Sequence, residues 1–414
     1  IVTGTLSAHP KGFGFVILSD MPDLFLHEKQ MRWVFNGDTV QAVGTSTDNR
    51  GRTEGRIVDI VERRQNNFIG TLAHDEEGYC VELGSPNNHQ PITVTEENVQ
   101  ALNAKQGAPV KVDIIDWPNQ HEFATGKITE VLSDDNDREL IIETTLLNYD
   151  IPSDFSEAAL QQANSYQEPT EKDLKGRKDL RDLPLITIDG EDARDFDDAV
   201  FAEKRSGGNY RVLVAIADVS YYVTPNSPLD KDAYERGTSV YFPHRVIPML
   251  PEVLSNGLCS LNPNLDRLCM VADIKISRAG KVTGYEFYPG VMHSQARLTY
   301  NQVNAYLANP KDKSVPESLT GNKDVKKSVD TLHQLYELLL KKREERHAME
   351  FETVETYIKF NEKGGIDAIL PRTRGDAQKL IEECMLLANT CAANFALKHE
   401  LPVLYRNHDK PDSE

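Results

Sequence analysis

Five aspartates fall within ten residues of this chain, directly after a short apolar run. The run, residues 185–188, has the length and composition of a buried strand. The acidic residues that follow it are Asp189, Asp192, Asp195, Asp197 and Asp198. Carboxylates held a few ångströms apart repel one another, so a fold that gathers them needs a compensating cation. Arg194 supplies one positive charge, whereas a hard divalent ion such as Mg²⁺ prefers oxygen ligands and would compensate more fully.

The acidic segment also has simpler interpretations. In an acidic protein, an Asp-rich loop is often a solvated turn whose carboxylates cap backbone groups. Asp195 and Asp197 form a D-x-D pair of the kind that phosphatases use as nucleophiles. Two features favour a metal site: the segment follows a buried strand, where ligands bind in α/β sheets, and Phe196 between the acids indicates a partly buried loop. Two divalent ions about 4 Å apart would stabilise the attacking and leaving oxygens of a phosphodiester displacement.

Residues 187–198, with the sequence TIDGEDARDFDD, closely resemble the signature of the RNase II/RNase R (RNB) family of 3′→5′ exoribonucleases. The resemblance extends over nearly the whole chain. It implies an α+β multidomain fold, with two tandem OB-fold barrels of the cold-shock type followed by a mixed α/β RNB catalytic domain. It also implies processive hydrolysis of single-stranded RNA to nucleoside 5′-monophosphates. The resemblance further implies the ligands of a bound Mg²⁺ ion, or of Mn²⁺ in its place. They are Asp189, Asp195, Asp197 and Asp198, and Asp197 is the residue implied to be most directly involved in the hydrolysis.

Two aromatic residues match family positions that stack on the 3′-terminal bases of the RNA. Tyr241, in the segment GTSVYFP, matches the tyrosine near the active site, although the residues alone also fit a buried tyrosine whose hydroxyl is satisfied. Phe351, in the shorter match MEFE, corresponds to the phenylalanine on the other side of the stack. The resemblance implies that the pair clamps the last bases and excludes the end of a duplex.

Asp218 has two interpretations. It is either a residue that supports the metal site without binding the ion or a cap at the end of a strand.

Residues 1–65 are predicted to form the first OB barrel and to carry an aromatic surface. In the segment KGFGFV, the two phenylalanines point to one face of a strand, and the glycines leave space beside them. The segment DLFLH adds a third phenylalanine and a histidine, and both segments resemble cold-shock RNA-binding motifs. Exposed rings bind single-stranded bases at about 1–3 kcal/mol per stacked base; alternatively, the three rings belong to the barrel core. The residues predicted to bind RNA here are Lys11, Phe13, Phe15, Phe25 and His27.

Residues 66–133 look like a second copy of the first barrel. The segment GTL at Gly4 recurs 66 residues later, and two further segments recur at offsets of 70 and 71 residues. The second copy has EGYC in place of the aromatic run, so we expect it to bind RNA more weakly, mainly through its backbone. Residues 134–182 follow as a connector that is helical in part of 144–164, and residues 183–414 form the N-terminal portion of the catalytic domain.

The composition fits a soluble globular protein, with 39% hydrophobic and 27% charged residues. No apolar run approaches the ~18 residues that span a membrane, so no membrane contact is expected.

Five scattered cysteines without a CxxC pair argue against a zinc site and against disulfides, and they favour a location in a reducing cytoplasm. The net charge of −19 argues against a protein that coats nucleic acid electrostatically. Residues 1–64 nevertheless contain eight Lys or Arg and eight Asp or Glu, so the acidic excess lies after them.

The chain begins at Ile1 without an initiator methionine or a signal peptide, so we expect it to be part of a longer protein. By resemblance, the family continues with an arginine motif that stabilises the scissile phosphate and then an S1-type RNA-binding barrel, and neither is found within these 414 residues. A second hypothesis is therefore an RNA-binding module with an incomplete, inactive nuclease core. The expected partners are single-stranded RNA and, by resemblance, the ribosome or the RNA-decay machinery.

Overall fold

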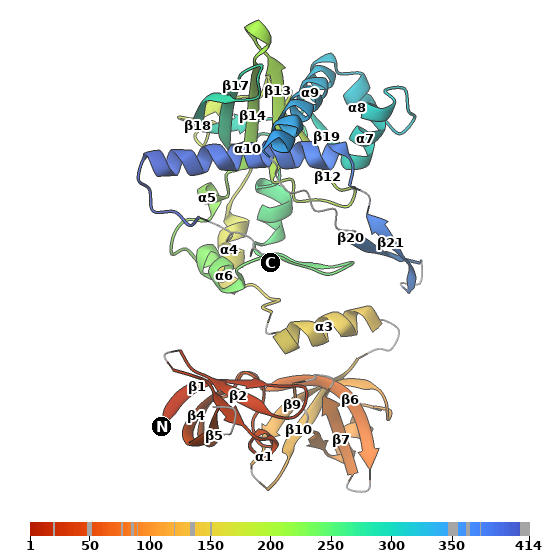
Figure 1. Cartoon of the computed structure of the whole chain (residues 1–414). Helices are drawn as coiled ribbons and strands as arrows, with labels where there is room; N and C mark the ends of the chain where they lie inside the picture. The colour runs from red at the N-terminus through yellow and green to blue at the C-terminus, as the bar shows by residue number, and fades with distance from the viewer. Residues whose placement is uncertain are drawn as a thin grey trace. The chain divides into compact units, whose positions relative to one another are not determined.

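In the computed structural model the chain divides into two compact units, Ile1–Ser153 and Asp154–Asn361 with Gly365–Glu414. We call them unit 1 and unit 2. Unit 1 contains many of the short strands, and unit 2 contains the two longest helices (Figure 1). The structure describes residues 1–19, 21–47, 52–75, 78–83, 87–88, 90–119, 121–132, 137–149, 151–346, 355–361, 365–372 and 374–405.

Unit 1 contains two closed five-stranded barrels, drawn in red to orange in Figure 1. Their strand orders are β1-β2-β3-β5-β4 and β10-β8-β7-β6-β9, which are the same closed cycle entered at different strands. This equivalence confirms the predicted tandem of OB barrels. The strands are β1 (Val2–Ala8), β2 (Gly14–Ile17), β3 (Leu24–Leu26), β4 (Thr39–Thr47), β5 (Thr53–Glu62), β6 (Asn67–Asp75), β7 (Gly78–Leu83), β8 (Ile92–Val94), β9 (Pro109–Asp116) and β10 (Ala124–Val131). The short helices α1 (Glu28–Met31) and α2 (Glu96–Ala101) precede the fourth strand of each barrel.

Equivalent glycines explain why the GTL segment recurs. A Cβ at Gly4 would lie 2.4 Å from a backbone oxygen of β2, and a Cβ at Gly70 would lie 2.3 Å from a backbone oxygen of β7. Any side chain at either position would therefore push two paired strands apart. A second repeated segment has a different cause, because Gly37 and Gly107 adopt φ values of +89° and +84° before β4 and β9. The predicted duplication thus reflects steric requirements that the two barrels share.

The two barrels contact each other within unit 1. Phe35, from the first barrel, is buried in the hydrophobic cluster of the second. Its ring lies 4.7 Å from that of Phe68 and 5.9 Å from that of Trp117. The backbone N–H of Asn36 donates to the Asn88 side chain at 2.9 Å. Apolar packing and hydrogen bonds therefore join the barrels.

Unit 2 is built around a seven-stranded mixed sheet of order β11-β18-β17-β14-β13-β12-β19. Its interior pairs are antiparallel, and the pairs β12 with β19 and β11 with β18 are parallel. The predicted strand at 185–188 is β12, and the predicted hairpin that follows the acidic segment is β13 and β14. The strands are β11 (Lys178–Asp179), β12 (Ile186–Asp189), β13 (Asp198–Lys204), β14 (Tyr210–Ala217), β17 (Arg267–Ile276), β18 (Val282–Met292) and β19 (Ala296–Thr299).

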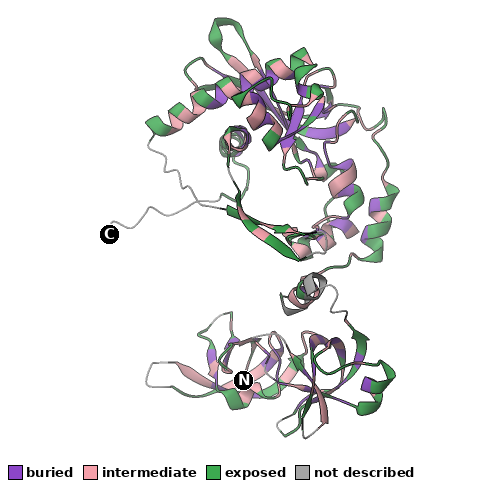
Figure 2. Ribbon diagram, turned by 90° about the vertical axis from the view of Figure 1, so that its right-hand side faces the viewer, coloured by how far each residue is buried: buried purple, intermediate pink, exposed green. Residues whose placement is uncertain are grey.

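Helices cover both faces of the sheet, and Figure 2 shows buried residues gathered in the sheet and on the inner sides of these helices. Val200 and Ala202 of β13 point into one hydrophobic cluster, whereas Ala199 and Phe201 point into the other, as strand alternation requires. The first face is covered by α7 (Tyr300–Ala308), α8 (Glu317–Thr320), α9 (Lys323–Glu345) and α10 (Asp376–Lys398). The second is covered by α4 (Glu157–Ser165), α5 (Val219–Tyr222), α6 (Pro228–Arg236) and the π-helical turn η3 (Val253–Leu258).

Helix α10 has the length and composition of a membrane span, with a mean hydropathy of 1.2 over its most apolar window. Its first half packs into the core of unit 2, whereas most residues of its second half are exposed. Leu380, Ile381 and Cys384 are buried against the sheet, and Glu383 pairs with Arg343 of α9 at 2.8 Å.

The connector is helical in part, as predicted, and contains two helices. Helix α3 (Asp137–Tyr149) ends before Pro152, and α4 starts after Ser156, whose side chain accepts a hydrogen bond from the Ala159 N–H at 3.2 Å.

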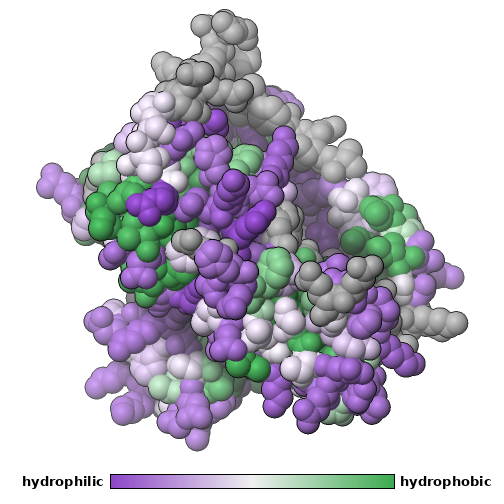
Figure 3. All heavy atoms as spheres, turned by 90° about the horizontal axis from the view of Figure 1, so that it is seen from below, coloured by the Kyte–Doolittle hydropathy of each residue, from purple (hydrophilic) through white to green (hydrophobic). Residues whose placement is uncertain are grey.

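Unit 2 also contains the 3₁₀ turn η2 (Ser206–Gly208) and two hairpins. The hairpins are β15 (Val240–Tyr241) with β16 (Val246–Ile247) and β20 (Glu355–Phe360) with β21 (Ile366–Arg372). The face of the molecule in Figure 3 is largely hydrophilic, with separate apolar patches.

Candidate active site and nucleic-acid interface

The acidic loop, residues 189–198, connects the adjacent strands β12 and β13. Phe196 is only 4% exposed and belongs to a core cluster. Its backbone N–H donates to the Ser260 hydroxyl at 3.0 Å, and its carbonyl accepts from the Leu261 N–H at 2.8 Å. The carbonyl of Asp197 accepts from the Ala217 N–H at 2.9 Å. These bonds and the buried ring fix the loop, so it is not a freely solvated turn.

The carboxylates of this loop are crowded and partly buried. Burial, together with the charges of Asp198, Asp197 and Asp195, raises the pKa of Asp189 to about 7. Burial and the Asp197 charge raise the pKa of Asp198 to about 6, and burial together with Asp195 raises the pKa of Asp197. Protons or a cation must therefore compensate the site near neutral pH.

One buried oxygen tests whether the loop fits a divalent ion. Asp189 Oδ2 is shielded from solvent and has no hydrogen-bond partner among the described residues. An unpaired carboxylate oxygen beside other carboxylates is the donor chemistry that Mg²⁺ and Mn²⁺ prefer. Within the described part of the chain, no group of three or more His, Cys, Asp or Glu side chains is placed so that it could hold a metal ion by itself. The donors fit an ion of the kind that retains waters and substrate oxygens.

Tyr241 reaches the acidic loop from hairpin β15–β16. Its hydroxyl donates to Asp195 Oδ2 at 3.2 Å, while 65% of the residue is exposed. The alternative of a buried tyrosine is therefore wrong, and the ring is free to meet a ligand beside the loop. Phe351, its predicted counterpart, lies outside the described residues.

Sequence reasoning missed the corner between β19 and α7, which holds the first half of the loop. Arg297 Nη2 donates to the carbonyls of Glu191 and Ala193 at 2.7 and 3.4 Å. Asn301 Nδ2 donates to the Glu191 carboxylate at 2.8 Å. Strand β19 runs beside β12 in parallel, with Thr299 opposite Asp189. Nothing in the local sequence indicated that these distant segments pair.

Helix α7 begins beside the acidic loop. Thr299 and Gln302 form a capping box at its N-terminus, next to Asp189. The positive end of a helix dipole stabilises a nearby carboxylate. Burial raises the pKa of Tyr300, the first residue of α7, to about 12, with smaller contributions from Asp189 and Asp198. Tyr300 is therefore a neutral hydroxyl close to the carboxylates.

Asp218 does not join the acidic loop. It forms an ion pair with Arg177 at 2.7 Å, and the two side chains are 7% and 9% exposed. Its side chain makes no cap bond to α5, although it accepts a hydrogen bond from Ser220 at 2.7 Å. Both sequence interpretations of Asp218 are therefore replaced by a buried ion pair.

The first barrel carries the predicted aromatic surface on strands β2 and β3 and on Phe13, which directly precedes β2. The rings of Phe13, Phe15 and Phe25 contact one another at centroid distances of 5.5–5.8 Å, and none belongs to the barrel core. The core alternative is therefore wrong. His9, which the sequence analysis missed, stacks on Phe13 at 4.2 Å. His27 lies 5.0 Å from Phe25, and its Nε2 is 3.1 Å from a Glu54 carboxylate oxygen.

The second barrel has a smaller ring pair at the equivalent place. His74 and Tyr79 lie opposite each other on β6 and β7, with ring centroids 4.4 Å apart.

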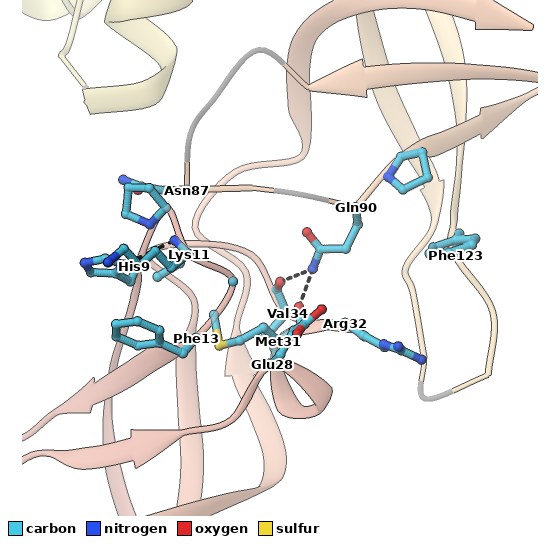
Figure 4. A pocket seen from close by; sticks show the side chains of 14 residues that line it. His9, Lys11, Phe13, Glu28, Met31, Arg32, Val34, Asn87, Gln90 and Phe123 are labelled. Carbon is cyan, nitrogen blue, oxygen red and sulfur yellow. Dashed lines mark hydrogen bonds between the residues drawn. The ribbon is translucent and has the colours of Figure 1, made fainter.

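A pocket of about 640 Å³ lies between the two barrels of unit 1 (Figure 4). Figure 4 shows Lys11 and Phe13 on one side of it and Gln90 near its centre. The Gln90 amide donates to the Met31 carbonyl at 2.6 Å and also to the Val34 carbonyl. The predicted Lys11 thus lies at a hollow beside the ring surface.

Comparison with known proteins gives the same architecture. The RNB domain profile matches residues 177–414, the Ribonuclease B OB domain profile matches 4–60, and the Cold shock domain profile matches 81–156. The chain is 45% identical over 417 residues to Ribonuclease R of Escherichia coli (strain K12), an alignment that covers 100% of this chain and 50% of that protein. It is 42% identical over 353 residues to Ribonuclease R of Acidithiobacillus ferrooxidans, covering 85% and 79%. The chain thus spans about half the length of the first of these relatives.

Solved structures agree with these matches. Mycoplasma genitalium RNase R in complex with ribose methylated single-stranded RNA has a TM-score of 0.86 at 26% identity, covering 99% of this chain and 64% of that one. Yeast Ssd1, a pseudonuclease, has a TM-score of 0.64 at 15% identity, covering 95% and 54%, and shares the fold alone. The fold by itself therefore does not establish catalysis. The profile matches and the identities to ribonuclease R proteins show that this chain belongs to the RNB (RNase II/RNase R) family.

Proposed function

We propose that this chain acts in a 3′→5′ exoribonuclease that degrades single-stranded RNA processively to nucleoside 5′-monophosphates. The observation that carries the proposal is the rigid acidic loop. It combines an unpartnered buried oxygen of Asp189 with the exposed ring of Tyr241, in a chain of the RNB family. Carboxylates can hold a divalent ion at a phosphodiester, and an exposed ring can stack on a single-stranded base, so the arrangement suits cleavage at the end of a single strand.

The proposed ligands of a divalent ion are Asp189, Asp195, Asp197 and Asp198, with Mg²⁺ as the expected ion and Mn²⁺ as its substitute. The raised pKa values of Asp189 and Asp198, about 7 and about 6, support this assignment because burial and the neighbouring carboxylates disfavour their charged forms unless a cation is present. When bound, such an ion would polarise the scissile phosphate and make a water more nucleophilic.

The residues of this chain would position the substrate. Tyr241 would stack on a terminal base while its hydroxyl remains bonded to Asp195. The bond from the Ala217 N–H to the Asp197 carbonyl would hold the Asp197 carboxylate in place during turnover. A water oxygen would form a bond to phosphorus as the bond to the 3′ oxygen of the preceding nucleotide breaks. The proton would pass to that oxygen, and the released nucleoside would keep the 5′-phosphate.

The remaining parts of the proposal concern binding and location. The rings of Phe13, Phe15 and Phe25, with Lys11 and His27 beside them, would hold the upstream strand by stacking, which favours processivity. The clamp of Tyr241 and Phe351 would exclude a duplex end. All five cysteines are free, which supports a reducing cytoplasm. Association with the ribosome or the RNA-decay machinery is a proposal from resemblance, and sedimentation with ribosomes would test it.

The test is Asp197→Asn. We expect the variant to bind oligo(A) as tightly as the unchanged protein, while mononucleotide release falls by at least about 100-fold, as for loss of a group that stabilises transition-state charge. Electrophoresis of 5′-labelled oligo(A) with Mg²⁺ measures release, and a binding titration in EDTA measures affinity. Asp192→Asn is the matched control, because Asp192 is exposed in the same loop and is not a proposed ligand. Retained turnover in Asp197→Asn would remove the assignment.

A second candidate is an RNA-binding module with an inactive nuclease core. The observation that favours it is the 50% coverage of the Escherichia coli relative, because the activity of the whole protein need not belong to the part matched here. Incubation of this chain with 3′-labelled oligo(A) and Mg²⁺ discriminates the two, since only the nuclease releases labelled mononucleotide. Turnover of p-nitrophenyl phosphate without RNA would instead support the phosphatase alternative.

A further inference from the structure

Arg297 is an arginine beside several aspartates that pairs with none of them. Over the ranges that the structure describes, no carboxylate lies within ion-pair distance of its guanidinium. Instead, Nη2 donates to the neutral carbonyls of Glu191 and Ala193, at 2.7 and 3.4 Å. The guanidinium also lies 5.2 Å from the Phe196 ring. The positive charge is therefore held at the acidic loop without a direct ion-pair partner, and it acts on Asp189 from a longer distance, where it lowers the pKa of that carboxyl.

The strand register explains the direction of this side chain. Arg297 lies between Ala296 and Leu298, both of which are buried in the cluster under α7–α10. Because side chains alternate along a strand, Arg297 points to the opposite face of β19. The residue is exposed, and its neighbour across the strand pair is Thr187, two residues before Asp189.

Three N–H groups of Arg297 remain available. A guanidinium has five donors, and the two on Nη2 face the loop carbonyls. Nε and Nη1 have no hydrogen-bond partner among the residues that the structure describes. They lie on different edges of the planar group, because Nε–H points to the side of Nη2, as in the Nε and Nη2 fork of Arg211 on Asp273. Nη1 is therefore the group that can donate to a phosphate oxygen while Nη2 stays on the loop.

We propose that Arg297 binds a phosphate of the RNA through Nη1 while Nη2 holds the acidic loop. This inference rests on the proposed function, since it names a contact to the same substrate. The phosphate is a linkage at the 3′ end, because the loop that the guanidinium holds carries the proposed catalytic aspartates. A single side chain would then hold the acidic loop and also bind the RNA strand that is cleaved.

The test measures how RNA affinity depends on salt. Removing one phosphate interaction from a single-stranded complex lowers the slope of log K against log salt by about 0.7. In EDTA, where no hydrolysis occurs, we expect Arg297→Gln to weaken oligo(A) binding several-fold and to lower the slope by about that amount. Arg297→Lys keeps the charge and should restore most of the slope. The control is Lys204→Gln, which removes one exposed charge about 20 Å from Asp198 along β13 and should leave the slope unchanged.

A substrate change locates the interaction. A neutral methylphosphonate placed at one linkage near the 3′ end should weaken binding by the unchanged protein and have no further effect on Arg297→Gln. An unchanged salt slope in Arg297→Gln would overturn the inference, even if its melting temperature fell, because Arg297 would then only hold the loop. Absence of RNA binding by the unchanged protein would instead refute the proposed function.

Discussion

At the scale of single residues, the acidic loop makes stability depend on pH. Burial and neighbouring charges raise the pKa of Asp189 to about 7 and that of Asp198 to about 6. In an unfolded chain an aspartate titrates near about 3.9. Between about pH 4 and about pH 7 the folded state therefore binds more protons than the unfolded state, so the stability of the metal-free protein decreases as pH rises.

Asp189→Asn tests this pH dependence. We expect the variant to raise the melting temperature in EDTA at pH 8, because it removes a repelled charge and Asp189 Oδ2 has no hydrogen bond to lose among the described residues. At pH 4, where the carboxyl is protonated in the folded state, the two proteins should melt alike. Thermal melts at both pH values measure the difference. A lower melting temperature at pH 8 would contradict this account, and Asp192→Asn serves as the exposed control.

The buried pair of Arg177 and Asp218 makes a separate prediction for stability. Arg177→Met leaves a buried carboxylate without its cation and should destabilise the protein by about 3–5 kcal/mol. Arg205→Met is the matched control, because Arg205 pairs with Glu203 at 2.6 Å while 54% of its side chain is exposed, and such pairs contribute about 0–1 kcal/mol. Urea titrations of both variants give the comparison. Equal losses would show that the buried pair has no special role.

At the scale of elements, the sequence predicted what neighbouring residues determine. The apolar run became β12, the hairpin after the loop became β13 and β14, and the duplicated segments became two barrels. It did not predict that β19 pairs with β12, because parallel pairing between distant segments has no local pattern. Arg297 and Asn301 were missed for that reason. In the connector, which was predicted to be helical in part, Pro152 lies in the break between α3 and α4 and disfavours a continuous helix.

The ring surface of the first barrel should bind RNA more strongly than the second barrel does. Replacing Phe13 and Phe15 by Ala removes rings that lie outside the barrel core, at an expected cost of about 1–3 kcal/mol per stacked base. Tyr79→Ala, in the smaller ring pair of the second barrel, should cost less. Anisotropy titrations with labelled oligo(U) measure both, and circular dichroism checks that the barrels remain folded. The reverse order of effects would refute this assignment.

At the scale of the whole molecule, the two units can be observed separately. The chain has two tryptophans, Trp33 and Trp117, and both lie in unit 1. Trp33 packs against the core of the first barrel, and Trp117 lies 4.5 Å from the Arg63 guanidinium, so unfolding of unit 1 will change their fluorescence. Unit 2 contains α9 and α10, each of 23 residues, so it dominates the helical circular dichroism signal.

The metal proposal therefore predicts that Mn²⁺ shifts only one of the two melting curves. A ligand at 100 times its Kd stabilises the folded state by about 2.7 kcal/mol, which corresponds to about 5–10 °C for a unit of this size. We expect the circular dichroism transition to rise by that amount while the tryptophan transition stays unchanged, because the acidic loop lies in unit 2. Asp197→Asn should reduce the shift. A rise in the tryptophan transition alone would place the ion in the barrels and refute the assignment of the acidic loop.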